Sequence, residues 1–169
     1  PLEVHDVSCI TAGCFNVEPK RIESLSAIVN AELDAIRPLA TARRVRLESF
    51  IDSNAGPLDG DEQRLRQVIH NLIAHALANT PAGGNVIAEC HGRKDHAEVV
   101  VRDNGMGIAA ETIPHVFDPL WQMHHVRADS TRAGGVWLGL AVIHRIVELH
   151  GGRIVASSDG HSMGAVFTV

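Results

Sequence analysis

The chain has 169 residues, of which 45% are hydrophobic and 21% are charged. This length and composition suit one folded domain with a single core, and they argue against intrinsic disorder. The formal net charge of −5 lacks the basic footprint of a nucleic-acid-binding domain, and no apolar run approaches the roughly 20 residues of a membrane span, so we expect neither a nucleic-acid partner nor membrane contact by this chain.

The cysteines and the first residues bear on location and domain organisation. Cys9, Cys14 and Cys90 are odd in number and lack metal-ligand spacing, so we expect reduced thiols in a cytoplasmic domain. Residues 1–15 resemble the tail of another element, because an extended-looking stretch follows them. The sequence therefore predicts a leading segment, 1–15, and one domain, 16–169.

The first half of the domain predicts two helices and a strand. Apolar residues at helical spacing indicate a helix from Ser24, and Val45–Glu48 then alternates like a strand. The strongest helix begins near Asp61, a good N-cap residue, and ends before the glycine-rich turn at 80–84. Its apolar stripe comprises Leu65, Val68, Ile69, Leu72, Ile73, Ala76 and Leu77.

The next part of the chain predicts a hairpin. Two β-rich runs, 85–91 and 96–102, are separated by a short polar turn. A glycine turn follows at 103–107, and a short helix is expected near 109–116. Hairpin connections favour an antiparallel or mixed sheet.

The last third begins with an irregular segment, 118–137, which is typical either of disorder or of a lid. Phe117 and Trp121 are expected to anchor the base of this segment in the core. An amphipathic helix is predicted from Leu140, and two strands, 153–157 and 164–169, close the chain. With about three helices and five or six strands, the inventory predicts an α+β sandwich with helices covering one face of the sheet.

Three features carry candidate chemistry, and the first lies on the helix from Asp61. Asn71, His75 and Ala78 have the spacing of one helix face, opposite the apolar stripe. An asparagine and a histidine side chain are thereby aligned on one face. Taken alone, the same pattern is also typical of a solvated helix face.

The second feature is the run Val99-Val100-Val101-Arg102-Asp103-Asn104-Gly105-Met106-Gly107. A strand delivers an aspartate, and two glycines then allow a tight turn and the close approach of a flat ligand. A carboxylate at this point can accept a hydrogen bond from an exocyclic amine, which would select adenine over guanine. A plain turn explains the run equally well when it is considered alone.

The third feature is Gly134-Gly135-Val136-Trp137-Leu138-Gly139-Leu140, which leads into an apolar helix. Free amides and a favourable dipole at a helix start form an anion-binding site. Glycine-rich helix entries also occur without a ligand, so the order of all three features is more informative than any one of them.

Together these motifs resemble the ATP-binding domain of the GHKL superfamily, and within it the sensor histidine kinases of two-component systems. RLRQVIHNLIAHALANTPAGG resembles the asparagine box, VRDNGMGI the first glycine box, IPHVFDPLWQ the phenylalanine box, and GGVWLGLAVIHRIVELHGGRI the second glycine box with its helix. The resemblance covers roughly 15–169, and residues 1–15 resemble the end of the family's dimerisation hairpin.

The resemblance implies the Bergerat fold, a two-layer α/β sandwich whose mixed, mostly antiparallel sheet has about three helices on one face. It implies that Asp103 contacts the adenine amino group and that Gly105, Gly107 and Ile108 shape the adenine pocket. Asn71 and His75 would be the catalytic and Mg²⁺-binding pair. The remaining cofactor-binding residues would be Gly135, Trp137, Leu138, Gly139 and Leu140, on the phosphate side.

The resemblance also implies the reaction and the partners. The reaction is transfer of the γ-phosphoryl group of Mg-ATP to a histidine, where catalysis is mainly positioning and charge neutralisation. The partners are ATP and ADP, the phospho-acceptor histidine domain of the same full-length protein, and a downstream response regulator. No histidine of this chain has the sequence context of a phospho-acceptor.

Several substitutions depart from the family pattern at the phosphate end. His75 replaces the second asparagine of the asparagine box, and imidazole suits softer metals than Mg²⁺. Ala78 replaces a basic residue. Val136 and Trp137 replace threonine and glycine, and Trp137 would be strained if its backbone needed a positive φ. Two hypotheses therefore remain: a histidine kinase domain with attenuated activity, or a degenerate module that acts through protein contacts.

Overall fold

The computed structural model describes residues 16–118, 121 and 134–169, and of 134–138 it describes the backbone alone. The segment 1–15 and most of the predicted lid lie outside the described residues. The helical elements are α2 (Leu25–Arg43), α3 (Glu62–Asn79), the 3-10 turn η1 (Ile113–His115) and α5 (Gly134–Leu149). The strands are β1 (Lys20–Ile22), β2 (Arg46–Ile51), β3 (Leu58–Gly60), β4 (Asn85–Gly92), β5 (Ala97–Asp103), β6 (Val155–Ser157) and β7 (Ala165–Thr168).

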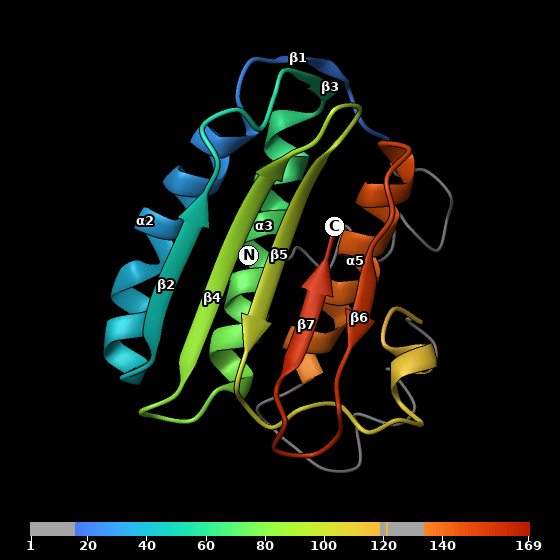
Figure 1. Ribbon diagram of the computed structural model, residues 1–169. Helices are drawn as coiled ribbons and strands as arrows, with labels where there is room; N and C mark the ends of the chain where they lie inside the picture. Colours follow the sequence, from blue (N-terminus) through green and yellow to red (C-terminus); the bar gives the residue numbers. More distant parts are fainter. Residues whose placement is uncertain (1–15, 119–120, 122–133) are drawn as a thin grey trace.

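The main sheet has five strands in the order β2-β4-β5-β7-β6. Strands β2 and β4 are parallel, and the other neighbours are antiparallel. Figure 1 shows α2, α3 and α5 side by side on one face of this sheet, with the small β1–β3 pair at one end. The predicted α+β sandwich, with a mixed and mostly antiparallel sheet, is confirmed.

The two layers follow from residue alternation in the central strands. In β4, Val86, Ala88 and Cys90 are fully buried, while the residues between them are only half-buried. Because successive side chains of a strand point to opposite faces, one face of β4 meets the helices and the other faces solvent. The same alternation in β5 buries Val101 and then Asp103, so this face carries an aspartate toward the helices.

The two long helices begin where the sequence provides capping side chains. Ser24 Oγ accepts a hydrogen bond from the Ala27 amide at 3.2 Å, and Asp61 Oδ1 accepts one from the Arg64 amide at 3.1 Å. These side chains satisfy amides that have no partner inside the helix. The prediction that Asp61 is the N-cap of the strongest helix is confirmed.

Some local details differ from what the sequence predicts. The short helix expected near 109–116 is present as the 3-10 helix η1, which covers only three residues. The last helix begins at Gly134, six residues before Leu140, because the glycine-rich run itself is helical. The pair β1–β3 was not expected, since each strand has three residues and shows no alternation over that length.

Among the described residues, no helix is long and apolar enough to cross a lipid bilayer.

Candidate functional site

Asp103 is the last residue of β5, and its side chain faces the helix layer with 7% of the residue exposed. Its Oδ1 accepts a hydrogen bond from the Gly105 amide at 2.8 Å, and the Ala165 amide also donates to the carboxylate. Burial raises the pKa of Asp103 above its ordinary value, while these two hydrogen bonds act in the opposite direction. Since a carboxylate has about four acceptor positions, Asp103 retains capacity for a ligand donor.

The turn after Asp103 approaches neighbouring backbone so closely that only glycine fits. A Cβ atom on Gly105 would lie 2.2 Å from the carbonyl oxygen of Asn79 at the end of α3. A Cβ atom on Gly107 would lie 1.9 Å from the carbonyl oxygen of Gly160, and Gly107 has a φ of +68°. The predicted need for glycine at 105 and 107 therefore has a steric basis in the structure.

The loop between β6 and β7 supports the same turn from the other side. Ser158 Oγ accepts a hydrogen bond from the Ile108 amide at 3.0 Å and donates one to the Gly164 carbonyl at 2.6 Å. The Ser162 amide donates to the Met106 carbonyl at 2.7 Å. Ile108, predicted to shape the adenine pocket, is 4% exposed and belongs to the core.

The polar side of α3 differs from a solvated face. His75 is 3% exposed, and its ring packs edge-on against Phe167 of β7, with 5.3 Å between ring centroids. The reading of Asn71 and His75 as a solvated helix face is therefore wrong for His75. Asn71 is half-buried, and its side-chain amide nitrogen is buried with no hydrogen-bond partner among the described residues. Such a donor is costly unless a ligand or water accepts from it.

Aromatic packing extends from His75 across the core. Phe167 also packs edge-on against Phe117, with 6.4 Å between centroids, and Phe117 stacks on His144 of α5 at 5.2 Å. The prediction that Phe117 anchors the segment after it in the core is confirmed. Trp121 stacks instead on the exposed ring of His115, at 5.4 Å.

The predicted phosphate side coincides with the first turns of α5. Gly135 lies in the first turn, where amides have no partner within the helix. Trp137 has helical backbone, so the strain expected from a positive φ at that position does not arise. Leu140 is fully buried in the core. The side chains of Trp137 and Leu138 lie outside the described residues.

Sequence reasoning missed several groups that build the site. The Ala165 amide, the Asn79 carbonyl and the Ser158 hydroxyl all hold Asp103 or its turn. Main-chain groups leave no signal in side-chain identity, which explains the first two. Gly164 was also missed, although the glycine itself was a signal in the sequence. Its φ is +70°, and a Cβ there would lie 2.0 Å from the Asp103 carbonyl, so the position requires glycine.

Comparison with known proteins agrees with this geometry. Residues 60–169 match the family described as histidine kinase-, DNA gyrase B- and HSP90-like ATPase. Histidine protein kinase DivJ of Caulobacter vibrioides is 32% identical over 99% of this chain and 27% of its own length. Sensor histidine kinase ZraS of Escherichia coli is 32% identical over 86% of this chain and 29% of its own length. The chain thus spans less than a third of these relatives.

Solved structures show the same fold. The catalytic domain of histidine kinase ThkA superposes with a TM-score of 0.73 at 21% identity, covering 89% of this chain and 93% of that one. Full-length ShkA in complex with AMPPNP superposes with a TM-score of 0.79 at 20% identity, covering 98% of this chain and 33% of that one. This chain belongs to the histidine kinase-, DNA gyrase B- and HSP90-like ATPase family, and over most of its length it is similar in sequence to sensor histidine kinases.

Proposed function

We propose that this domain binds ATP with the adenine amino group donating to the Asp103 carboxylate. The observation that carries the proposal is the buried carboxylate itself, which is held by two amides, lies beside a turn of obligatory glycines and keeps acceptor capacity. A nucleobase amine is a neutral donor, so it suits a buried acceptor better than a solvated cation does. ShkA, which has the same fold, was solved with the ATP analogue AMPPNP.

The phosphates are proposed to lie toward Asn71 and the first turn of α5. The buried amide nitrogen of Asn71 would gain a phosphate oxygen as its acceptor, and the free amides near Gly135 would attract the negative charge. Ala78 and His75, the substitutions expected to attenuate activity, lie on the same helix as Asn71.

Mg²⁺ fits this donor set only in part. Among the described residues, no group of three His, Cys, Asp or Glu side chains is placed to hold a metal ion. Asn71 can offer an amide oxygen, whereas His75 offers a nitrogen and is packed against Phe167. We therefore assign Asn71 as the protein ligand, with nucleotide oxygens and water as the others. When bound, the ion neutralises charge on the transferred phosphoryl group.

The proposed reaction is transfer of the γ-phosphoryl group to a histidine on a separate dimerisation domain. The bond from the γ-phosphorus to the bridging oxygen breaks, a bond to the histidine nitrogen forms, and ADP leaves. This chain holds and orients the nucleotide, because phosphoryl transfer depends mostly on positioning and charge stabilisation. The segment 1–15 is proposed to be the end of that domain's hairpin, and a response regulator would receive the phosphoryl group afterwards. ThkA was solved in complex with the response regulator TrrA.

Two measurements test the proposal. Titration calorimetry with a non-hydrolysable ATP analogue should show binding to the wild type and at least about tenfold weaker binding to Asp103→Asn, since a charge-assisted hydrogen bond contributes roughly 1.5–3 kcal/mol. Equal heats from both proteins, or none from either, would remove the adenine assignment. Transfer of labelled phosphate to a separately added histidine domain then tests the reaction. Nucleotide binding without any transfer would favour the alternative, a degenerate module acting through protein contacts, which gains no support from the relatives above.

A further inference from the structure

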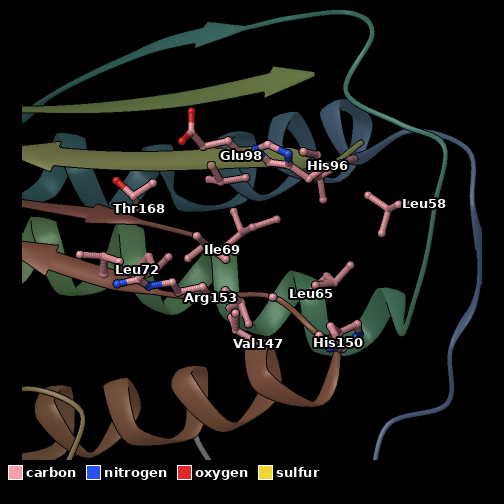
Figure 2. Close-up of a pocket in the computed structure, with 18 of the residues that line it drawn as sticks. Leu58, Leu65, Ile69, Leu72, His96, Glu98, Val147, His150, Arg153 and Thr168 are labelled. Atoms are coloured by element: carbon pink, nitrogen blue, oxygen red, sulfur yellow. The ribbon is translucent and has the colours of Figure 1, made fainter. Parts of the chain in front are cut away.

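A cavity lies at the end of β5 opposite to Asp103. It has a volume of about 660 Å³ and is lined by residues 97–99 at the start of β5, whereas Asp103 ends that strand. Helix α3 contributes its first turns, and α5 contributes its last turn and the residues that follow (Figure 2). The volume falls within the range of small-ligand sites, which is roughly 300–1,000 Å³. None of the residues assigned to the ATP site lines this cavity.

The interior of the cavity is mostly apolar. Its walls include Leu58 of β3, Leu65, Ile69 and Leu72 of α3, Val147 of α5 and Val155 of β6. Figure 2 shows these side chains, where labelled, converging from α3, α5 and the strands on one space. Covering an apolar surface of this kind with a ligand is favourable, by roughly 25 cal/mol for each Å² removed from water. An occupant should therefore have an apolar body.

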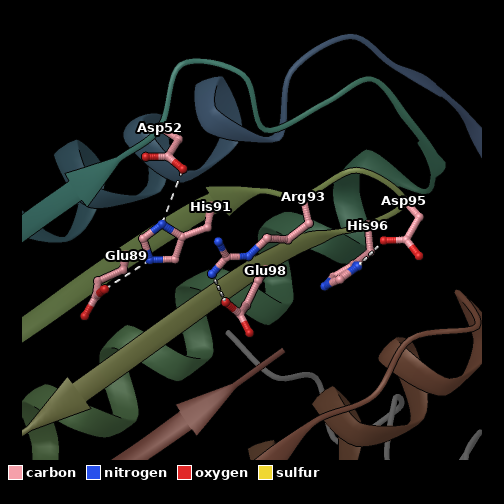
Figure 3. Close-up of polar contacts among 7 residues, drawn as sticks. All are labelled: Asp52, Glu89, His91, Arg93, Asp95, His96 and Glu98. Atoms are coloured by element: carbon pink, nitrogen blue, oxygen red, sulfur yellow. Dashed lines mark hydrogen bonds and ion pairs between the residues drawn. The ribbon is translucent and has the colours of Figure 1, made fainter.

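Most charged groups around the rim already have partners. Glu98 accepts a hydrogen bond from Arg93 at 3.0 Å, and Asp95 pairs with His96 at 2.8 Å (Figure 3). His150 Nε2 accepts from the Asp61 amide at 2.9 Å, while its Nδ1 lies 2.7 Å from the Ile146 carbonyl. Both ring nitrogens of His150 therefore already contact backbone groups.

Two charged residues of the lining remain uncommitted. Neither Arg153 nor Asp59 makes an ion pair or a side-chain hydrogen bond with any residue that the structure describes. Arg153 lies on the connection from α5 to β6, and Asp59 lies on β3. Figure 2 shows the Arg153 side chain running along the cavity lining, in the same region as Ile69 and Leu72. A guanidinium so placed offers its planar donors beside an apolar wall.

We propose that this cavity binds an amphipathic carboxylate, a molecule with an apolar chain or ring and one carboxylate that pairs with Arg153. The guanidinium matches a carboxylate because two parallel N–H groups can donate to its two oxygens. The apolar body fills the space between α3, α5 and the strands. The competing occupant is a cationic amphiphile that pairs with Asp59. We expect it to bind more weakly, because an ammonium group and the Asp59 carboxylate do not form the two parallel hydrogen bonds that a guanidinium and a carboxylate form.

The test uses the whole 169-residue chain with decanoate as the probe and methyl NMR as the readout. Decanoate should shift the methyl signals of Leu65, Ile69 and Val147 saturably, and should leave those of Ile28 on α2 unchanged. Arg153→Gln keeps an unbranched stem but removes the charge, and it should weaken decanoate binding by about tenfold or more. Arg37→Gln, at another exposed arginine, should leave the affinity unchanged.

Neutral and cationic probes separate the alternatives. Decanol should bind at least about tenfold more weakly than decanoate, because it lacks the group that pairs with Arg153. Equal affinities for decanol and decanoate, or equal affinities of wild type and Arg153→Gln for decanoate, would overturn the proposal. So would tight binding of decylamine that is lost in Asp59→Asn. Because Arg153 is exposed, its replacement leaves the core intact, and an unchanged methyl spectrum without ligand verifies this.

Discussion

The carbonyl oxygen of Asn79 accepts a hydrogen bond from the Met106 amide at 3.0 Å. This bond joins the last turn of α3 to the glycine turn after β5, so the element that carries Asn71 and the element that carries Asp103 hold each other in place. Within α3, the Asn79 side chain is itself held in place, because its Nδ2 donates to the His75 carbonyl at 2.9 Å.

Gly107→Ala should destabilise the domain by more than the conformational penalty of a left-handed residue. The new methyl group would collide with the Gly160 carbonyl, in addition to the roughly 1–2 kcal/mol that alanine loses at a positive φ. Gly151→Ala is the matched control, since Gly151 has a φ of +72° and no atom within 4 Å of the added Cβ. Urea denaturation should rank Gly107→Ala clearly below Gly151→Ala, and equal losses would contradict the steric argument.

The sequence predicts the layers of this fold because they depend on side-chain periodicity. The stripe on α3 and the alternation in β4 both reappear as buried residues. Helix α5 was predicted too short because the glycines at 134 and 135 disfavour helix, whereas the structure includes both in the helix. Asp103 was identified because it stands beside glycines, but its contacts with main-chain groups of distant residues required coordinates.

The same limit explains the misreading of His75. Its spacing from Asn71 placed it on the polar side of α3, and the pattern of α3 alone gives no information about Phe167, which lies 92 positions later. The cavity beside Arg153 also escaped prediction, because the pair β1–β3 that helps to enclose it has no periodic signal. Local pattern thus determines which face of an element is buried, while contacts between distant segments determine what each polar residue touches.

Asp103 should make stability depend on pH in an identifiable direction. Burial raises its pKa above the ordinary aspartate value of 3.8, so the folded domain holds the proton more tightly than the unfolded chain does. This contribution to stability is complete below 3.8 and is lost as the pH rises through the raised value of the folded state. Asp103→Asn removes it. Urea unfolding of both proteins from pH 3.5 to 7 should therefore show the wild type losing stability relative to the variant as pH rises, and parallel curves would contradict the assignment.

Restoring the family residues at the phosphate end should tighten nucleotide binding in magnesium buffer. His75→Asn supplies an amide oxygen in place of an imidazole, and Trp137→Gly removes a bulky residue from the first turn of α5. The combined variant should bind an ATP analogue more tightly with Mg²⁺, and less so with EDTA. Losing the edge-on contact between His75 and Phe167 should also reduce stability by about 0.5–1.5 kcal/mol. Unchanged affinity in magnesium buffer would show that these positions do not limit binding.

Asp61→Ala should destabilise α3 by about 0.5–2 kcal/mol, the usual cost of losing an N-cap acceptor. Asp61 accepts hydrogen bonds from the Arg64 amide and from the Glu18 amide, so its loss also releases the chain before β1.

Burial alone would raise the pKa of Asp61, but these hydrogen bonds outweigh it and the pKa is lowered. The carboxylate therefore stabilises the fold above its ordinary pKa, and that contribution is lost as pH falls through the lowered value. Asp61→Asn is the control, because asparagine still caps a helix. Thermal unfolding at pH 7 should place Asp61→Asn between the wild type and Asp61→Ala, and an alanine variant as stable as the wild type would show that the cap contributes nothing.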